Sequence, residues 1–209
     1  MNAEADGDSG RAIPRMRVLI ADDVRETRRG TRLMLALNPT VKIVAIAHNG
    51  MEAVELAKKH KPEIAIMDIN MPEMDGISAI RAMRQQNPEL CCIVISVERE
   101  TYIYDEAMEA GACAYLVKPF TVDELNEAVE RASQEVMSSR SRNLALVDLA
   151  QEYIEARRSD DQAVSIFEQL AANPACELRW LVSLGIIYML RGEWGKLKAL
   201  AERLETEQN

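Results

Sequence analysis

Two adjacent carboxylates end the apolar run Arg17-Val-Leu-Ile-Ala-Asp22-Asp23, near the start of the chain. A second run of this kind, Glu63-Ile-Ala-Ile-Met-Asp68, also ends in a carboxylate, and a third, Ala114-Tyr-Leu-Val-Lys118-Pro119, ends in a lysine. Short apolar runs bounded in this way are typical of buried strands. In open α/β folds, the carboxyl ends of parallel strands share one rim, and ligands bind there. We therefore expect the three charged ends to meet at one edge of a parallel sheet.

The charges at this rim predict a particular kind of site. Three crowded carboxylates repel one another, so they stay ionised only with a cation among them. Oxygen ligands without cysteine or histidine favour Mg²⁺ over zinc. The lysine adds a positive group that can pair with a phosphoryl oxygen. Asp22, Asp23, Asp68 and Lys118 thus indicate a Mg²⁺-dependent site that handles phosphate.

Further motifs, in the same order along the chain, resemble the receiver domain of two-component response regulators. The acceptor loop of that family is similar to Met67-Asp68-Ile69-Asn70-Met71-Pro72-Glu73-Met74-Asp75-Gly76, and its fourth and fifth strands to Val94-Ile95-Ser96 and Tyr115-Leu-Val-Lys118-Pro119-Phe120. The resemblance covers residues 14–137. It implies a bacterial, cytoplasmic signalling phosphoprotein that uses Mg²⁺. The phosphoryl donor would be the phosphohistidine of a sensor kinase or phosphotransfer protein.

The resemblance also implies which residues hold the metal and the phosphate. Asp68 would accept the phosphoryl group. Mg²⁺ would bind Asp23 directly, Asp22 through water, Asp68, and the backbone carbonyl of Asn70. The side chains of Asn70 and Glu98 match two positions that tune autodephosphorylation, because they overhang the site and can orient or obstruct an attacking water.

A second set of residues resembles the family's phosphate sensor. Lys118 would neutralise the transferred phosphoryl group, and the hydroxyl of Ser96 would donate to one of its oxygens. Tyr115 matches the aromatic switch that turns inward when this hydroxyl moves. Val97 is larger than the alanine more usual at its position, and its bulk limits the room for Tyr115 to swing.

Charge and composition exclude several classes of protein. The chain carries a formal net charge of −9 over 209 residues, which argues against a protein whose main task is binding nucleic-acid phosphates. No apolar run approaches the length of a membrane span. Residues 1–13 are mostly small and acidic, the reverse of a signal peptide, and predict a disordered leader. The four cysteines lack zinc-ligand spacing, and most are expected to be buried free thiols in a reducing cytosol.

From residue 17 onward, short β-branched runs alternate with longer amphipathic stretches. We expect strands over residues 17–22, 42–47, 63–68, 91–96 and 113–117. We expect helices over residues 25–37, 50–60, 76–86, 100–110 and 121–137. The alternation predicts a doubly wound α/β fold with a five-stranded parallel sheet, and the family resemblance implies the flavodoxin-like order 2-1-3-4-5. Thr121 and Glu124 have the spacing of a capping box for the last helix.

Beyond residue 137 the composition changes. Residues 138–142 are polar and are expected to form a linker, and residues 143–209 a second, smaller all-α domain. Part of its sequence repeats after 35 residues: Leu146, Leu149, Ala150 and Tyr153 recur as Leu181, Leu184, Gly185 and Tyr188. With the closing Asn173-Pro174, this resembles the tetratricopeptide pattern, although the second copy lacks the alanine and the aromatic residue of its second helix. The alternative is a four-helix dimerisation or regulatory tail whose tyrosines are ordinary core.

Two such hairpins are fewer than the three or so repeats that normally support a stack. The apolar faces with Leu146, Tyr153, Phe167, Leu184 and Tyr188 therefore need further cover. The last helix of the receiver, a second copy of the chain or a separate partner can supply it. A symmetric homodimer is our first expectation, since two-fold pairing is the commonest arrangement. Receivers of this family also often pair through their fourth and fifth helices when phosphorylated.

These observations favour a signalling module over two other classes of protein. We expect a response regulator whose helical tail binds a protein partner and which is not an enzyme. The alternative is a transcriptional regulator with an atypical DNA-binding tail. Residues 143–209 contain 7 Lys plus Arg and 11 Asp plus Glu, a net charge of 7 − 11 = −4, whereas a DNA-reading helix has a basic face. An output enzyme is not expected, because the tail has no histidine and a single cysteine.

Overall fold

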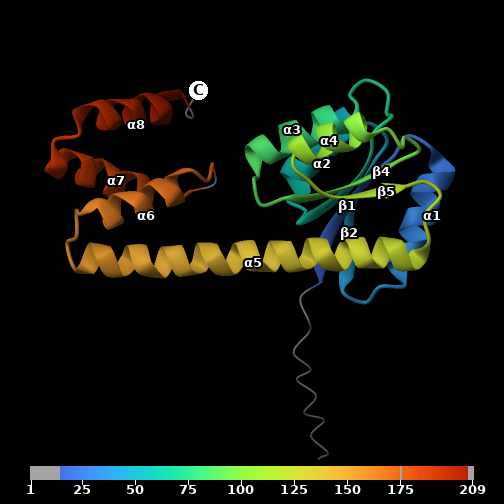
Figure 1. The fold of residues 1–209 in the computed structure, drawn as a ribbon, viewed down its shortest axis with the longest axis horizontal. Helices are drawn as coiled ribbons and strands as arrows, with labels where there is room; N and C mark the ends of the chain where they lie inside the picture. Colours follow the sequence, from blue (N-terminus) through green and yellow to red (C-terminus); the bar gives the residue numbers. More distant parts are fainter. Residues whose placement is uncertain (1–14, 175, 207–209) are drawn as a thin grey trace, which may run out of the picture.

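The computed structural model describes residues 15–174 and 176–206. Five parallel strands form one sheet in the order β2-β1-β3-β4-β5 (Figure 1). The strands are β1 (Met16–Ala21), β2 (Val41–Ala47), β3 (Ile64–Asp68), β4 (Cys91–Ser96) and β5 (Ala112–Val117). The expected fold class and strand order are confirmed. The expected leader, residues 1–13, lies outside the described residues.

Helices cover both faces of this sheet (Figure 1). They are α1 (Arg25–Ala36), α2 (Gly50–His60), α3 (Gly76–Gln86), α4 (Thr101–Glu109) and α5 (Val122–Glu155). One buried cluster packs α2, α3 and α4 against the sheet, and a second packs α1 and α5 against the opposite face. Because β3 and β4 are buried along their whole length, their sequences are nearly continuous apolar runs.

Side-chain caps start three of these helices. The Asn49 side chain accepts a hydrogen bond from the backbone N–H of Glu52, 2.7 Å away, and starts α2. The Asp75 side chain does the same for Ser78 at the start of α3, at 2.8 Å. The capping box expected at the start of α5 is present. Each cap satisfies backbone N–H groups that the first turn of a helix leaves without partners.

The helix that follows β5 is longer than the sequence analysis expected. α5 runs without interruption from Val122 to Glu155, so the expected helix end at residue 137 and the expected linker at residues 138–142 are wrong. The stretch contains no proline or glycine that would end a helix. In addition, Arg140 pairs with Glu63 and Asn143 donates to Glu89, and these contacts fasten the middle of α5 to the loops before β3 and β4.

Three further helices stack in succession on the second half of α5, the first of them on α5 itself and each of the others on the helix before it (Figure 1). They are α6 (Asp161–Ala171), α7 (Leu178–Arg191) and α8 (Trp194–Thr206). Tyr153, Phe167, Leu184 and Tyr188 are buried in their common core, and Leu146 is partly buried against it. The cover for these residues comes from the tail's own helices, α5 beyond residue 143 among them, and no residue of the expected last receiver helix, 121–137, belongs to this core. We call residues 15–137 the α/β part and residues 143–206 the tail.

The cysteines differ from the expectation. Cys91 at the start of β4 and Cys113 in β5 form a disulfide, with Cα atoms 5.9 Å apart. Because a register shift follows Cys92 in the pairing of β4 with β5, Cys91 and Cys113 lie on the same face of the sheet, under α5. Cys92 points to the opposite face, and burial raises the pKa of its thiol to about 12. The expectation of free thiols is therefore wrong for this pair and right for Cys92.

Candidate functional site

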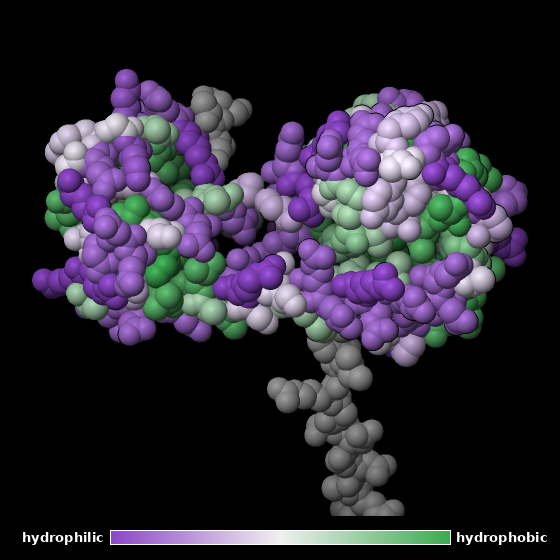
Figure 2. Space-filling view, in the orientation of Figure 1, coloured by the Kyte–Doolittle hydropathy of each residue, from purple (hydrophilic) through white to green (hydrophobic). Residues whose placement is uncertain are grey.

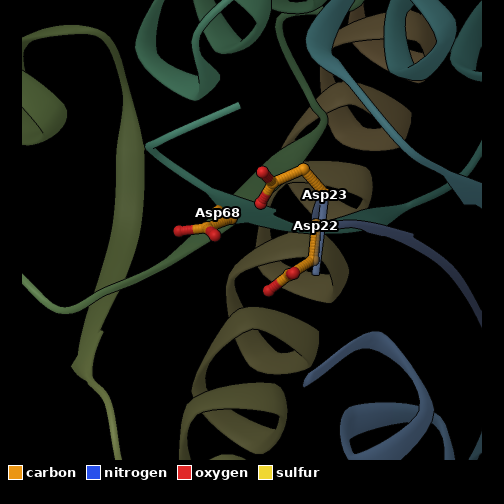
Figure 3. A group of neighbouring side chains, drawn as sticks. All are labelled: Asp22, Asp23 and Asp68. Carbon is orange, nitrogen blue, oxygen red and sulfur yellow. The ribbon is translucent and has the colours of Figure 1, made fainter. Parts of the chain in front are cut away.

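Three carboxylates gather where β1 and β3 end. Asp22 and Asp23 directly follow β1, and Asp68 is the last residue of β3. Figure 3 shows their three side chains close together. One oxygen of each carboxylate lies within 4.8 Å of one oxygen of each of the others. Asp22 and Asp68 are buried, whereas Asp23 is exposed. The expected meeting of these residues at one edge of the sheet is what the structure shows.

Lys118 enters the same cluster from the end of β5. Its Nζ donates to Oδ2 of Asp22 at 2.8 Å and to Oδ2 of Asp68 at 2.7 Å. Its side chain is 14% exposed, so these contacts are largely shielded from water. An exposed surface lysine, the ordinary alternative for this residue, is excluded. One ammonium facing three carboxylates leaves the cluster with an excess of negative charge.

The ionisation of this cluster reflects its burial and its pairing. Burial raises the pKa of Asp68 above its ordinary value, and the hydrogen bond from Lys118 opposes that shift only in part. Burial on its own would lower the pKa of Lys118, but its hydrogen bonds to Asp22 and Asp68 raise it. Lys118 is therefore a firmly protonated cation, and burial makes the charged form of Asp68 less favourable than that of an exposed aspartate.

Backbone contacts hold the buried carboxylates in place. Oδ1 of Asp22 accepts from the backbone N–H of Val24 at 2.8 Å, and the carbonyl oxygen of Asp22 accepts from Nη1 of Arg28 at 2.6 Å. Gly76, at the start of α3, lies so close to the carbonyl oxygen of Asp68 that any Cβ there would overlap it. Glycine at this position therefore allows α3 to begin directly beside the end of β3.

The cluster fits a hard divalent cation. Its ligand atoms are carboxylate oxygens, and among the described residues no cysteine or histidine joins the group. The excess negative charge and the exposed Asp23 suit an ion that keeps several of its waters, as Mg²⁺ does. A cation bound there would also relieve the unfavourable burial of the Asp68 charge.

Ser96 and Tyr115 lie on the next two strands of the sheet, β4 and β5. Ser96 is fully buried at the end of β4, and its Oγ accepts from the backbone N–H of Glu98 at 3.1 Å. The hydroxyl of Tyr115, on β5, donates to the backbone carbonyl of Glu98 at 3.0 Å. The Tyr115 ring meets the ring of Tyr104 edge to face, with centroids 5.6 Å apart. Ser96 and Tyr115 are thus connected through the backbone of one residue, Glu98.

Asn70 and Glu98 approach each other from two loops. Nδ2 of Asn70 and Oε1 of Glu98 are 3.4 Å apart. Asn70 is exposed and lies two residues beyond the end of β3, while Glu98 lies two residues beyond the end of β4. Val97, whose bulk was expected to limit the movement of Tyr115, is 61% exposed. The structure therefore brings together the expected tuning pair.

Arg28 supports the site without having been predicted from the sequence. Its guanidinium binds the carbonyl of Asp22 from α1 and fixes the turn that carries the paired aspartates. The only available signal was its spacing, six residues after Asp22 and inside the next helix, which many surface arginines share. The sequence analysis also missed Glu63, whose Oε2 accepts from the backbone N–H of Arg17 at 2.6 Å at the opposite end of the sheet.

Comparison with known proteins assigns the α/β part to a family. The model of the response regulator receiver domain matches residues 18–130. The chemotaxis protein CheY of Bacillus subtilis is 38% identical over 115 residues, which make up 55% of this chain and 95% of that protein. The transcriptional regulatory protein DegU of Brevibacillus brevis is 34% identical over 120 residues, 57% of this chain and 51% of that protein. The chain thus matches about half the length of the second relative.

Solved structures agree with this assignment. One chain in a crystal structure of the CheX–CheY–BeF₃–Mg²⁺ complex from Borrelia burgdorferi aligns with a TM-score of 0.53 and 27% identity. The alignment covers 57% of this chain and 93% of that chain. None of the described helices is both long enough and apolar enough to cross a membrane. The buried acidic cluster, the strand order and the matched residues lead to one conclusion: the chain belongs to the response regulator receiver domain family.

Proposed function

We propose that this chain is a response regulator in which Asp68 accepts a phosphoryl group from the phosphohistidine of a sensor kinase or phosphotransfer protein. The observation that carries the proposal is the buried Asp68 carboxylate, which accepts from Lys118 at 2.7 Å and lies beside two further carboxylates. Such donors and acceptors work in the cytoplasm, where we place the protein. Catalysis by the chain is limited to this transfer, and its output is binding.

The transfer forms a bond between a carboxylate oxygen of Asp68 and phosphorus and breaks the nitrogen–phosphorus bond of the donor. The imidazole nitrogen leaves with the bonding electron pair. Phosphoryl transfer leaves a protein little to do beyond positioning and charge neutralisation. Mg²⁺, when bound, supplies positive charge beside the phosphoryl oxygens, and we assign its ligands to Asp22, Asp23, Asp68 and the carbonyl of Asn70. Lys118 already reaches Asp68 and would pair with an oxygen on the new phosphoryl group.

The connected pair Ser96 and Tyr115 is the proposed sensor of phosphorylation. A phosphoryl oxygen on Asp68 would accept a hydrogen bond from the hydroxyl of Ser96 and draw it closer. That hydroxyl now accepts from the N–H of Glu98, whose carbonyl holds Tyr115. A shift at Ser96 therefore reaches Tyr115 through a single residue. Ligation can move the equilibrium only by the difference in interaction energy between the two states.

Asn70 and Glu98 are the proposed tuning residues. Their side chains are 3.4 Å apart, in the loops that follow β3 and β4, and we expect them to hold or obstruct the water that hydrolyses the acyl phosphate. Replacement of either one is expected to change the lifetime of phosphorylated Asp68 and to leave its formation intact.

We propose that the tail is the output and that it binds a protein. Its helices resemble tetratricopeptide hairpins in sequence. It is continuous with the α/β part through α5, whose capping box lies three residues after Lys118. A transcriptional output remains the alternative, which the name of the DegU relative favours and the tail's net charge of 7 − 11 = −4 opposes. Homodimerisation of the phosphorylated receiver is part of the proposal, and Tyr102 and Tyr104, exposed on α4, offer the surface.

The acceptor assignment is tested with radiolabelled acetyl phosphate and Mg²⁺. The unmodified chain is expected to take up label that is lost on alkaline hydrolysis, as an acyl phosphate requires. Asp68→Asn should abolish uptake while the circular dichroism spectrum stays unchanged. Asp105→Asn, at an exposed site on α4, is the matched control and should keep full uptake. Label retained by Asp68→Asn would contradict the assignment.

A further inference from the structure

Two helices of the tail end in the same turn, 35 residues apart. At the end of α5, the backbone N–H of Arg157 donates to the carbonyl of Ile154 and that of Arg158 to Tyr153, at 3.0 and 2.9 Å. At the end of α7, the N–H of Gly192 donates to Met189 and that of Glu193 to Tyr188, at 3.2 and 2.9 Å. This pair of bonds defines the Schellman motif, in which one residue adopts the left-handed conformation.

The residue in the left-handed position differs between the two turns. Gly192 has φ of 70°, and Arg157 has φ of 51°. Glycine adopts this conformation without steric cost, whereas a side chain with a Cβ is strained there. The geometry of the turn therefore favours glycine at both positions. A non-glycine residue in a strained conformation is grounds for a functional hypothesis, and at Arg157 that hypothesis concerns the side chain.

An apolar groove begins beside Arg157, between the end of α5 and α7. Its cavity volume is about 290 Å³. Phe167 and Ile187 are buried at its base, and Ile154, Ile186 and Leu190 line it while they are 41%, 49% and 72% exposed. Figure 2 shows apolar patches of this kind on the otherwise hydrophilic surface of the tail. Large apolar side chains that line a concave surface mark a binding site more often than scattered ones do.

The charged residues that line this groove are both arginines, Arg157 and Arg158, so its charge is positive. The Arg158 guanidinium stacks over the ring of Tyr153, 4.0 Å from its centroid, and pairs with Asp160 at 2.6 Å. Arg157 is exposed and forms no ion pair with any described residue. The groove thus offers an apolar wall and one guanidinium that is open to a carboxylate.

We propose that this groove binds an acidic amphipathic segment of a protein partner. Apolar side chains of the segment lie against Ile154, Ile186 and Leu190, and a carboxylate pairs with Arg157. A second copy of the chain fits less well, because two-fold pairing places the same surface on both sides, and the described residues that line the groove include no carboxylate that could pair with Arg157. This inference rests on the proposed output function and specifies the surface and the chemistry of the ligand.

The test uses the full chain and a random 15-residue peptide library displayed on phage. Enriched peptides are expected to combine apolar residues with Asp or Glu. Fluorescence anisotropy then gives the affinity of a labelled peptide from this set. Arg157→Gly should weaken binding about tenfold, the loss expected for one charged hydrogen bond. Its melting temperature should stay the same or rise, since Gly192 shows that the turn accepts glycine.

Further variants make the test specific. Ile186→Ser should also weaken binding, whereas Val182→Ser, half-exposed on α7 outside the groove lining, should leave it unchanged. A peptide with Gln in place of its acidic residue should bind Arg157→Gly and the unmodified chain equally. Failure to enrich any peptide, enrichment without acidic residues, or full affinity of Arg157→Gly would overturn the proposal. So would a homodimer that Ile186→Ser dissociates in sedimentation experiments.

The same measurements separate this inference from the proposed function. Binding that depends on Arg157 but not on phosphorylation would support the groove and defeat the phosphorylation switch. Phosphorylation-dependent binding that Arg157→Gly leaves intact would support the switch and overturn the groove. BeF₃⁻ with Mg²⁺ serves as the phosphoryl mimic, and Asp68→Asn is the control that cannot respond to it.

Discussion

The α/β part and the tail are built on opposite principles. The α/β part buries two carboxylates and a hydroxyl at one edge of an apolar sheet, and a lysine from β5 pairs with both carboxylates. The tail buries apolar side chains, and its ion pairs lie at the periphery. A site made of buried charges requires particular residue types at particular strand ends, so its chemistry can be inferred from sequence. A packed helical core specifies shape and leaves the ligand open.

The largest expected difference between the two parts follows from truncating the core of the tail. Phe167 is fully buried, and Phe167→Ala should cost about 3–5 kcal/mol of stability. Both tryptophans, Trp180 and Trp194, lie in the tail, so urea unfolding followed by tryptophan fluorescence reports on the tail. The midpoint should fall strongly, while Mg²⁺ still stabilises the α/β part. Leu178→Ala, at a 59% exposed position of α7, is the control. Loss of the Mg²⁺ response in Phe167→Ala would show that the two parts fold as one unit.

A break in α5 should separate the two parts. Ser141→Pro removes one hydrogen bond of the helix and places its ring against the preceding turn, at a cost of about 3 kcal/mol. Arg140 and Arg142 flank this exposed serine, so brief digestion with trypsin measures opening of the helix there. The variant should be cleaved after Arg142 much faster than Ser141→Ala, whereas the bond after Arg140 then precedes proline and resists trypsin. Equal cleavage of the two variants would mean that this segment of α5 is already open.

Mg²⁺ should act on only one of the two parts. At about 100 times its dissociation constant, a ligand of the folded state adds about 2.7 kcal/mol of stability. The midpoint temperature of unfolding of the α/β part, followed by circular dichroism, should rise with Mg²⁺. The midpoint of the tail, followed by tryptophan fluorescence, should change little. Asp23→Asn should remove the response, and Asp105→Asn should keep it. A response retained by Asp23→Asn would remove this residue from the proposed metal site.

The smallest expected effect is that the stabilities of the α/β part and of the tail depend on pH in opposite directions. Without Mg²⁺, burial raises the pKa of Asp68, so the folded state binds this proton more tightly, and stability falls as pH rises from about 3.9 through the raised value. Hydrogen bonds from Tyr188 and Lys196 lower the pKa of Glu168 in the tail, so its contribution is present above about 4.3 and is lost as pH falls. Asp68→Asn should flatten the curve of stability against pH for the α/β part, and Glu168→Gln should flatten that for the tail. Curves of the same slope in both parts would contradict this assignment of charges.

The sequence predicted the α/β part well for a physical reason. Strand ends such as Asp68 and Lys118 carry both a periodicity and a charge, and the two signals agree. The end of α5 was not predictable in this way, because the polar residues near Arg140 are equally compatible with a linker and with an exposed helix. The residues that contact this part of α5, Glu63 with Arg140 and Glu89 with Asn143, lie far away in sequence. The pairing of Cys91 with Cys113 likewise depends on a register shift that no local pattern signals.

The uninterrupted α5 has a consequence for how chains of this design can vary in length. In a helix, each added residue turns everything that follows by about 100° and advances it by about 1.5 Å. One residue inserted near Ser141 would therefore present the tail to a different side of the molecule, with every contact inside each part preserved. Seven inserted residues would restore the original facing to within about 20°. The direction in which the tail faces is thus a matter of helical phase, and the count of residues between the two cores sets it.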